Sequence, residues 1–460
     1  MDTALVLAAG AGRGAWPYGG ARQKTTLPVA QTPMVLRLVM QLKAAGINDV
    51  VVVVGVGEGA VRGCLADVPG VRFARQAQAQ GCGDATLAGL ADTTAGRVLV
   101  CYGDVVASQA ALELLLTKDR ENGAEATLLG ATFQQGLPVW ESVEMDAAGA
   151  VSGVWNKGGA EHPRYAGMAI CDAAVLRQAL EQSPGYVDNV GVGAMTPPEN
   201  SLPAALNRLC QQGHALHCVV AQECVVDVNR PWDLVEANRS ANRALLAEAA
   251  GVVLGKGATI DDGADIPGDA AIILGDDAHI GKGVIVHGDV ILGDGARAVS
   301  GAILGARVNL GAHSTAREYA RIHDDTVVGA RNLIGHCAEF AGLSFEKTLL
   351  WHYCCMTAVI GARVDIGAAT CCGTWRFDDR VREQEVGMHR ETPPYYGGMA
   401  FLGDQMRTGV NVIINPGVRV GGHSCIGPGV ILYDDVPDGR LVLAKQEHSC
   451  KAWGPERYNW

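Results

Sequence analysis

The chain has no long hydrophobic run and no excess of basic residues. No uninterrupted apolar stretch in its 460 residues reaches the length of about 18 residues that suggests a membrane-spanning helix. The first residues, MDTALVLAAG, lack the basic segment of a secretory signal peptide. The net charge of −12 argues against nucleic acid and anionic membranes as partners. We therefore expect a cytoplasmic protein that binds neither.

The sequence also lacks the pattern of a small disulfide-stapled domain. Its 14 cysteines are spread over a chain that is long enough for two domains. Four of them form the adjacent pairs Cys354–Cys355 and Cys371–Cys372. A framework of disulfides is typical of short secreted chains, so a reducing compartment is the simplest setting for these thiols.

The first half of the chain alternates strand-like and helix-like segments. Apolar runs predict buried strands over 3–10, 49–55 and 96–104, and an amphipathic pattern predicts a helix over 33–46. Short apolar strands separated by helices indicate a mostly parallel sheet with helices on both faces. Ligands of such sheets bind outside the carboxyl ends of the strands, where the glycine-rich turn 10–14 and Asp104 both fall.

The second half follows a six-residue repeat. Small aliphatic residues recur at every sixth position from Ile260 to Val308, and glycines occupy another phase of the same period. After a shift the repeat returns at Gly361, and again from Gly403. Such a unit builds one flat face, and three faces make one coil of a parallel β-helix. We expect a nucleotide-binding α/β domain over 1–230, a linker helix over 231–250, the β-helix over 251–440 and a C-terminal tail over 441–460.

The glycine-rich turn is one part of a candidate site for a nucleotide and a metal ion. Backbone N–H groups of such a strand-to-helix turn can hold a phosphate, and Lys24 supplies a cation. The segment QAQAQGCGDAT (76–86) offers amide side chains for a base edge. Carboxylates follow apolar strands in CYGD (101–104) and VDVNRPWDL (226–234), as Mg²⁺ bound with a nucleoside triphosphate requires.

These motifs resemble a known family. LAAGAGRGAWP with Lys24, YGD and VDVNRPWDL look like the signature set of sugar-1-phosphate nucleotidyltransferases. Joined to a hexapeptide repeat, the whole chain resembles the bifunctional N-acetylglucosamine-1-phosphate uridylyltransferase/glucosamine-1-phosphate acetyltransferases, the archaeal type most closely. The resemblance implies a Rossmann-like nucleotidyltransferase domain, a left-handed parallel β-helix, Mg²⁺, UTP or dTTP, a sugar phosphate and acetyl-CoA. It also implies a homotrimer, or a hexamer built from trimers.

The resemblance assigns roles residue by residue in the first half. Arg13 and Lys24 match catalytic cations, and Asp104, Asp227 and Asn229 match metal ligands. The positions that match nucleotide contacts are Leu7, Ala8, Ala9, Gly10, Gly12, Gln76, Gly81, Cys82, Tyr102 and Gly103. Three positions depart from the family pattern. Gly14 stands where the family has arginine, and Trp155 and Tyr165 stand near the family's sugar-contacting acid and asparagine.

In the second half the resemblance implies an acetyltransferase site between β-helices of a trimer. His352 is the nearest candidate for the general base, which should have a pKa near neutrality. It stands one residue after the family position, so either a local bulge restores its direction or it is a surface or interface histidine. Tyr353, Thr374 and Arg376 occupy the positions of sugar-phosphate contacts, and Thr374 stands where the family has asparagine. Gly409, Asn411 and Ser424 match the acyl-CoA channel.

Two further features allow more than one interpretation. Cys354 and Cys372 stack if the coil between them is regular, and they either fill corners of the β-helix or, with His336 and Cys371, hold a metal ion. Residues 380–398 break the repeat, which predicts a loop that is either solvated or placed over a neighbouring subunit's site. Besides a bifunctional transferase, the altered positions allow a catalytically degenerate regulatory or scaffold protein that its β-helix trimerises.

Overall fold

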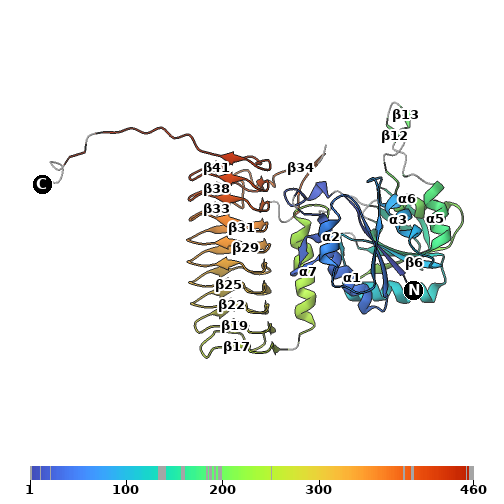
Figure 1. The fold of residues 1–460 in the computed structure, drawn as a ribbon, viewed down its shortest axis with the longest axis horizontal. Helices are drawn as coiled ribbons and strands as arrows, with labels where there is room; N and C mark the ends of the chain where they lie inside the picture. The colour runs from blue at the N-terminus through green and yellow to red at the C-terminus, as the bar shows by residue number, and fades with distance from the viewer. Residues whose placement is uncertain are drawn as a thin grey trace.

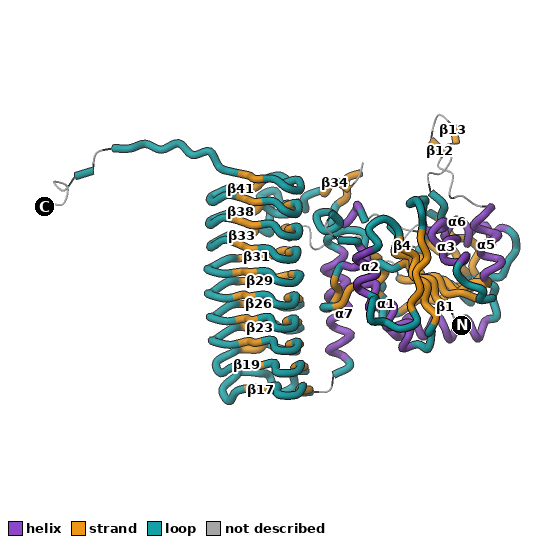
Figure 2. Tube along the Cα trace, in the orientation of Figure 1, coloured by secondary structure: helices purple, strands orange, loops and turns teal. Residues whose placement is uncertain are grey.

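Two structural units lie side by side in the computed structural model of the protein (Figure 1). An α/β domain occupies one side, a stack of β coils the other, and helix α7 (Asp233–Ala247) runs along the coils between them. The structure describes residues 3–10, 12–20, 22–132, 141–156, 161–182, 185, 189–190, 193–194, 199–249, 251–386, 389–394, 398–451 and 453–454. Figure 2 shows the contrast between the helices and central sheet of the first unit and the short strands and turns of the second.

A mixed sheet forms the centre of the first unit. Its parallel part has the order β5–β4–β1–β6, with β1 over Thr3–Ala8, β4 over Asp49–Val54, β5 over Val71–Arg75 and β6 over Arg97–Tyr102. The rest includes antiparallel pairs and consists of β11 (Arg164–Asp172), β8 (Ala126–Ala131), β14 (Leu216–Ala221), β9 (Ser142–Met145) and β10 (Val151–Trp155). The strands β1, β4 and β6 lie where the apolar runs predict strands. The prediction of a mostly parallel sheet is confirmed for the part of the sheet that carries the nucleotide motifs.

Helices cover both faces of this sheet, as predicted. One buried cluster joins the sheet to α1 (Met34–Ala44) and α4 (Gln109–Asn122). A second cluster on the opposite face contains α3 (Cys82–Ala91), α5 (Ala173–Gln182) and α6 (Leu202–Gln211). Side-chain caps fix where α4 and α6 begin, because the Ser108 and Ser201 hydroxyls accept hydrogen bonds from backbone N–H groups of the first turn. The helix α2 (Gly59–Cys64) completes this unit.

The second unit is a parallel β-helix with three faces. The first face consists of β17 (Thr259–Ile260), β19 (His279–Ile280), β22 (Arg297–Ala298), β25 (Thr315–Ala316), β28 (Leu333–Ile334), β30 (Leu349–Leu350), β32 (Asp365–Ile366), β37 (Arg407–Thr408), β40 (Cys425–Ile426) and β42 (Leu441–Val442). The second consists of β20 (Ile285–Val286), β23 (Ile303–Leu304), β26 (Arg321–Ile322), the starts of β29 (Glu339–Ser344) and β31 (Cys355–Ile360), β33 (Cys371–Cys372), β38 (Ile413–Ile414) and β41 (Ile431–Leu432). The third consists of β16 (Val252–Leu254), β18 (Ile272–Leu274), β21 (Val290–Leu292), β24 (Val308–Leu310), β27 (Val327–Val328), the ends of β29 and β31, β36 (Ala400–Leu402) and β39 (Arg419–Val420).

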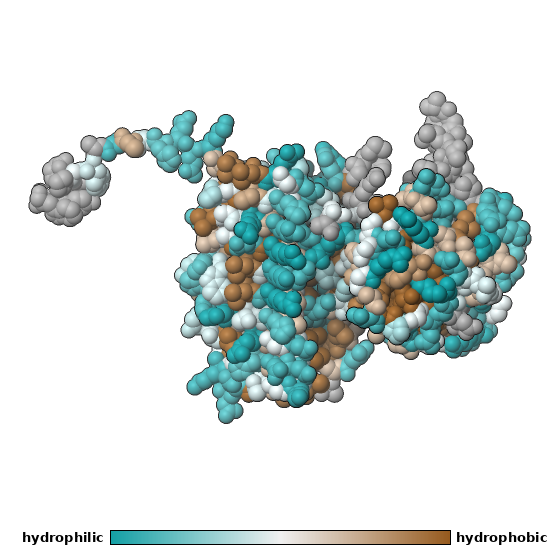
Figure 3. Space-filling view, viewed as in Figure 1, coloured by the Kyte–Doolittle hydropathy of each residue, from teal (hydrophilic) through white to brown (hydrophobic). Residues whose placement is uncertain are grey.

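The periodic aliphatic residues form the core of this β-helix. From Ile272 to Val308 every sixth residue is fully buried in one continuous cluster. Ile260 and Ile266 are partly buried against the same cluster at the open first coil. The prediction of a hexapeptide β-helix is therefore confirmed. Because coils stack in register, side chains of one kind form columns on its surface, and Figure 3 shows hydrophilic columns beside a hydrophobic one.

The shift in the repeat has a simple cause. Val290 pairs with Val308 eighteen residues later, but Val327 pairs with Leu343 and Leu343 with Val359, so these two coils are each sixteen residues long. The expectation that Cys354 stacks on Cys372 is therefore wrong. Cys355 pairs in register with Cys371, while the Cys372 thiol packs on Met356, with 3.7 Å between the sulfur atoms. No group of three or more His, Cys, Asp or Glu side chains that could hold a metal ion occurs in the described part of the chain, so a metal site at these cysteines finds no support.

The third face of the β-helix packs against the α/β domain. A buried cluster combines Tyr18, Met34 and Trp232 from the first unit with Phe345 and Phe401 from the second. The ring centroids of Tyr18 and Phe345 are 5.2 Å apart, and those of Trp232 and Phe401 are 6.2 Å apart. The linker helix predicted over 231–250 is α7, and its residues belong to this shared core. The two units therefore form one packed body.

The segment that leaves the coils after β33 also bridges the two units. It contains the hairpin of β34 (Gln384–Val386) and β35 (His389–Glu391). The Glu391 carboxylate pairs with the Arg230 guanidinium of the first unit, with Nε to Oε2 at 2.6 Å. The described part of this loop is therefore anchored to the first unit at Glu391, and its placement over a neighbouring subunit's site stays a prediction. None of the helices in the described ranges has the length and apolar character needed to cross a bilayer.

Candidate functional site

A cavity of about 620 Å³ opens at the carboxyl ends of the parallel strands. This is the edge at which ligands of such sheets bind. Most of the predicted nucleotide and metal positions line it, namely Leu7, Ala9, Gly10, Gln76, Gly81, Cys82, Tyr102, Asp104, Asp227 and Asn229. The structure thus brings together residues that are more than 200 positions apart in the sequence.

The polar end of the cavity is built by two short paired strands. The strands β7 (Val105–Val106) and β15 (Val226–Asp227) are antiparallel, and the Val228 N–H donates to the Asp104 carbonyl at 3.0 Å. This pairing places Asp227 beside Asp104. Lys24 starts the short 3-10 helix η2 (Lys24–Thr26), and its ammonium group contacts the Asp104 carboxylate and the Asn229 Oδ1, the latter at 2.6 Å. Cation and carboxylates therefore meet at one point.

The buried carboxylate of Asp227 has one oxygen atom available to bind a cation. Its Oδ2 accepts a hydrogen bond from Asn229 Nδ2 at 2.8 Å, but its buried Oδ1 has no hydrogen-bond partner among the described residues. Burial, and then the neighbouring Asp104, raise the pKa of Asp227 to about 7. Two carboxylates and an amide oxygen form the oxygen-rich set that Mg²⁺ prefers, so these residues fit a divalent ion.

Lys24 keeps its charge in this setting. Burial works to lower the pKa of its ammonium group, but the Asp104 and Asp227 carboxylates outweigh burial and leave the pKa raised. A cation held in place before substrate binds needs little reorganisation when negative charge arrives.

Asp233 shapes the loop that carries Asn229, and sequence reasoning assigned it no role. Its Oδ2 accepts hydrogen bonds from the backbone N–H groups of Asn229 and Arg230, at 2.9 and 2.7 Å. Burial raises the pKa of Asp233 to about 6. The signal was present in VDVNRPWDL, because an aspartate side chain can hydrogen-bond to the backbone of residues three or four positions before it.

The glycine-rich turn is packed too tightly for side chains at two positions. Gly12 has a φ of +64°, and a Cβ added there would lie 2.8 Å from the Lys24 Cβ. A Cβ at Gly14 would lie 2.7 Å from the Asn229 carbonyl oxygen and 2.6 Å from Nη1 of Arg230. Glycine at position 14, in place of the family's arginine, thus allows the Asn229 backbone to approach the turn closely. Arg13 begins the 3-10 helix η1 (Arg13–Ala15), its side chain lies outside the described residues, and its catalytic role stays a prediction.

Several predicted nucleotide contacts also hold the cavity wall together. Gln76 is buried, and its Nε2 donates to the Gly81 carbonyl at 3.0 Å and to Asp84 at 2.8 Å. The Tyr102 hydroxyl donates to the Cys82 sulfur at 3.3 Å. Gly103 donates from its N–H to the Leu7 carbonyl at 2.9 Å, so β1 and β6 end together.

Glu141 is a cavity residue that sequence reasoning missed. It lines the cavity, and burial raises the pKa of its carboxyl group. Tyr165, one of the departures from the family pattern, is buried nearby with its ring 5.9 Å from Tyr102, and its hydroxyl has no partner among the described residues. Trp155 is 42% exposed, and its indole Nε1 donates to Glu144 at 3.1 Å. No periodicity or motif marks Glu141, so no sequence signal could have found it.

The corner between the first and second faces of the β-helix gathers four of the candidate residues of the second unit. His352 lies there with a φ of +56°, its Nδ1 2.5 Å from Nδ1 of His336. The Tyr353 hydroxyl lies 3.2 Å from Nε2 of His336. The Ala369 N–H donates to the His352 carbonyl and the Asn411 N–H to the Ala368 carbonyl, both at 2.8 Å. Asn411, with Gly409 beside it, therefore stacks on the same corner.

Three other predicted residues lie elsewhere. Thr374 and Arg376 follow β33 at the next corner, across the second face from His352, where Arg376 pairs with Asp378 at 2.8 Å. Ser424 is buried between the third and first faces, and its hydroxyl donates to the Pro437 carbonyl at 3.0 Å and accepts from the Arg440 N–H at 3.1 Å. A single chain thus brings His352, Tyr353, Gly409 and Asn411 together, and leaves these three apart.

The fold and the first site define a nucleotidyltransferase-type α/β domain joined to a hexapeptide β-helix. Residues 4–181 match the model of the MobA-like NTP transferase domain. The bifunctional protein GlmU of Streptomyces avermitilis is 28% identical over 437 residues, which cover 88% of this chain and 85% of that protein. GlmU of Methanococcus maripaludis strain S2 is 23% identical over 455 residues, covering 97% and 98%. The bifunctional sugar-1-phosphate nucleotidylyltransferase/acetyltransferase of Sulfurisphaera tokodaii is 24% identical over 442 residues, covering 95% and 99%. These comparisons confirm the resemblance that the sequence motifs predict.

We expect Asp227→Asn to raise the thermal unfolding midpoint of the protein in buffer without divalent ions. The pKa of Asp227, raised to about 7 by burial and Asp104, lies above the unfolded value of about 3.9. The folded state therefore favours the protonated carboxyl group. The free energy of unfolding falls as the pH rises from about 4 to about 7, and the full loss of stability remains above that range. Thermal unfolding at about pH 5 and pH 8.5 checks this: asparagine should help more at the higher pH. An equal rise of the unfolding midpoint at both pH values would contradict a raised pKa for Asp227.

Proposed function

We propose that the first half of the chain transfers a nucleotidyl group from UTP or dTTP to a sugar-1-phosphate. A phosphate oxygen of the sugar attacks the α-phosphorus, the bond to the bridging oxygen of the β-phosphate breaks, and pyrophosphate leaves. The product is a nucleotide sugar of the UDP-N-acetylglucosamine type. The observation that carries the proposal is the meeting of Lys24, Asp104, Asp227 and Asn229 at the strand ends of one cavity.

The chain's own residues supply position and charge for this reaction. Lys24 places a buried ammonium group where the phosphates would enter, and the backbone N–H groups of the glycine-rich turn can point at the same anion. Asp104, Asp227 and Asn229 would hold Mg²⁺, which when bound neutralises charge that develops on the phosphates. Gln76, Gly81 and Cys82 form the wall that would meet the base. Glu141, which lines the same cavity, would meet the sugar.

One assay tests this proposal. Purified protein is incubated with Mg²⁺, UTP or dTTP and a panel of sugar-1-phosphates, and pyrophosphate release is followed. Turnover with at least one pair supports nucleotidyl transfer. Nucleotide binding without any turnover would contradict it and would favour the regulatory or scaffold alternative.

We further propose that the β-helix transfers an acetyl group from acetyl-CoA to an amino-sugar phosphate. The stacking of Gly409 and Asn411 on the His352 corner supports this assignment, because donor channel and base would share one edge. Since Thr374 and Arg376 lie at the next corner, the site needs a neighbouring subunit to bring the two corners together. A homotrimer through the β-helix, or a hexamer, and a cytoplasmic location belong to the same proposal. The Ser424 hydroxyl is engaged within the chain, so we do not include it among the acyl-CoA contacts.

His352→Ala is expected to lower acetyl transfer at least about a hundredfold if His352 removes the proton of the attacking amine. Thiol release from acetyl-CoA in the presence of glucosamine-1-phosphate measures the effect. His313→Ala is a matched control, because His313 also occupies a β-helix corner at positive φ but far from Asn411 in the stack. Unchanged thiol release in His352→Ala would mean that His352 is a surface or interface histidine.

A further inference from the structure

The segment that follows β1 carries the glycine-rich turn and ends at Lys24, and we call it the phosphate-binding loop (residues 10–24). Its side that faces away from the nucleotide cavity contacts the β-helix. The Tyr18 hydroxyl donates to the Val359 carbonyl at 2.7 Å, and the Tyr18 side chain is fully buried. Trp16 Nε1 lies 3.3 Å from both carboxylate oxygens of Asp438, and the Arg419 guanidinium lies 4.8 Å from the centre of the Trp16 ring. These partners come from different coils, so the loop lies along the β-helix and is not fixed at one point only.

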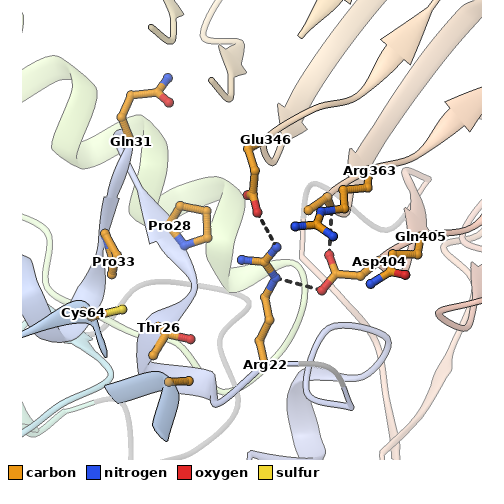
Figure 4. Close-up of a pocket in the computed structure, with 12 residues that line it drawn as sticks. Arg22, Thr26, Pro28, Gln31, Pro33, Cys64, Glu346, Arg363, Asp404 and Gln405 are labelled. Carbon is orange, nitrogen blue, oxygen red and sulfur yellow. Dashed lines mark hydrogen bonds and ion pairs between the residues drawn. The ribbon is translucent and has the colours of Figure 1, made fainter. Parts of the chain in front are cut away.

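Arg22 adds two ion pairs to these contacts (Figure 4). Its Nε donates to Asp404 Oδ2 at 2.7 Å and its Nη2 to Glu346 Oε1 at 2.8 Å, across a cavity of about 510 Å³ between the two units. Asp404 is only 3% exposed, and its other oxygen accepts from the Ala362 N–H at 2.6 Å. A guanidinium shared by two carboxylates has a fixed direction, which a single exposed ion pair would not give.

Gln23 connects Arg22 to the part of the loop that faces the nucleotide cavity. Its Nε2 donates to the carbonyls of Ala8 and Gly10, at 2.7 and 3.1 Å. Its Oε1 accepts from the Thr25 N–H at 2.7 Å and so caps η2, the helix that begins with Lys24. Arg22, Gln23 and Lys24 are consecutive. We therefore expect a shift of Arg22 to move both Lys24 and the glycine-rich turn, which are the two parts that would contact the phosphates.

We propose that Arg22 is a positioning residue through which the β-helix holds the phosphate-binding loop in its active geometry. Nucleotidyl transfer in the first half then depends on Asp404 and Glu346 of the second half, neither of which touches the nucleotide cavity. This inference rests on the proposed function for its catalytic consequence. The mechanical part, that these carboxylates order residues 10–24, stands on the contacts alone.

Variants on the β-helix side test the proposal in the full-length protein. Asp404→Asn and Glu346→Gln remove the charge that Arg22 contacts, and the second variant changes a carboxylate that is 40% exposed and so of little weight in folding. Asp294→Asn is the matched control. Like Asp404, Asp294 accepts a hydrogen bond from a backbone N–H of the preceding coil, that of Asp276 at 2.9 Å, but it lies in coils away from the loop.

The first readout is amide hydrogen exchange of residues 10–27 without substrate. We expect faster exchange in Asp404→Asn and Glu346→Gln, and no change in Asp294→Asn or in the β-helix core of any variant. The second readout is pyrophosphate release, in which kcat should fall about tenfold to a hundredfold, because a small misplacement of reacting groups has that effect. Arg22→Lys, which can reach one carboxylate but not both, should lie between wild type and Arg22→Gln.

The outcomes separate this inference from the proposed function. Unchanged exchange of residues 10–27 in both β-helix variants would overturn the inference, whatever the activity. Faster exchange with unchanged kcat would overturn the link from loop order to catalysis. If wild type showed no nucleotidyl transfer, the proposed function would fail, while the exchange experiment would still decide whether the β-helix orders the loop.

Discussion

Asp104→Asn is expected to lower nucleotidyl transfer at least about a thousandfold, because it removes charge from a preorganised electrostatic site. The variant keeps the shape of the side chain but takes away the carboxylate that pairs with Lys24 and that faces Asp227. Without it a divalent ion would lose one of the two proposed charged ligands, and the Lys24 ammonium group would lose its ion-pair partner and keep only Asn229. Pyrophosphate release with Mg²⁺ and a triphosphate measures the loss.

Two comparisons make this prediction specific. Asp49→Asn removes a carboxylate of the same domain that pairs with Arg72, at 2.9 Å, and should leave transfer unchanged. Acetyl transfer by the Asp104 variant should also be unchanged, since Asp104 lies in the cavity of the first unit. Retention of pyrophosphate release in Asp104→Asn would show that the metal ligands are assigned wrongly.

The parts of the fold that depend on local pattern could be predicted from the sequence. The strand of residues 3–8 and the helix of residues 34–44 follow from apolar spacing, and the β-helix core follows from the six-residue period that runs to Val308. The candidate site was predictable for a similar reason. Glycines and carboxylates at strand ends carry their chemistry in their residue type, and the sheet brings those ends together.

The parts that depend on contacts between distant segments could not be predicted. The two sixteen-residue coils pair Cys355 with Cys371, a register that the eighteen-residue period does not suggest. Ser424 falls in the interior because the corner it occupies turns its hydroxyl toward Pro437. The ion pair of Arg230 with Glu391 joins residues from different units, and neither residue type nor spacing marks such a pair in one sequence.

Gly14→Arg, which restores the family residue, is expected to abolish nucleotidyl transfer and not to improve it. An added Cβ at position 14 would lie 2.7 Å from the Asn229 carbonyl and 2.6 Å from the Arg230 guanidinium. Backbone must therefore move, and the backbone that moves carries Asn229, whose Oδ1 contacts Lys24 and whose Nδ2 contacts Asp227. Gly14→Ala introduces the same Cβ without new charge and should show most of the loss.

The measurement is pyrophosphate release by the two variants, compared with Gly63→Ala. Gly63 lies in α2 of the same domain, where an added Cβ meets no atom within 4 Å, so this control should keep full activity. A gain of activity in Gly14→Arg would mean that the turn can open to admit a cation and that the site lacks one. A loss in both Gly14 variants would mean that this turn works by close backbone packing, with Arg230 filling the space in which the family's arginine would begin. In that case the glycine at position 14 is a requirement of the site, and the absence of arginine there is no sign of lost function.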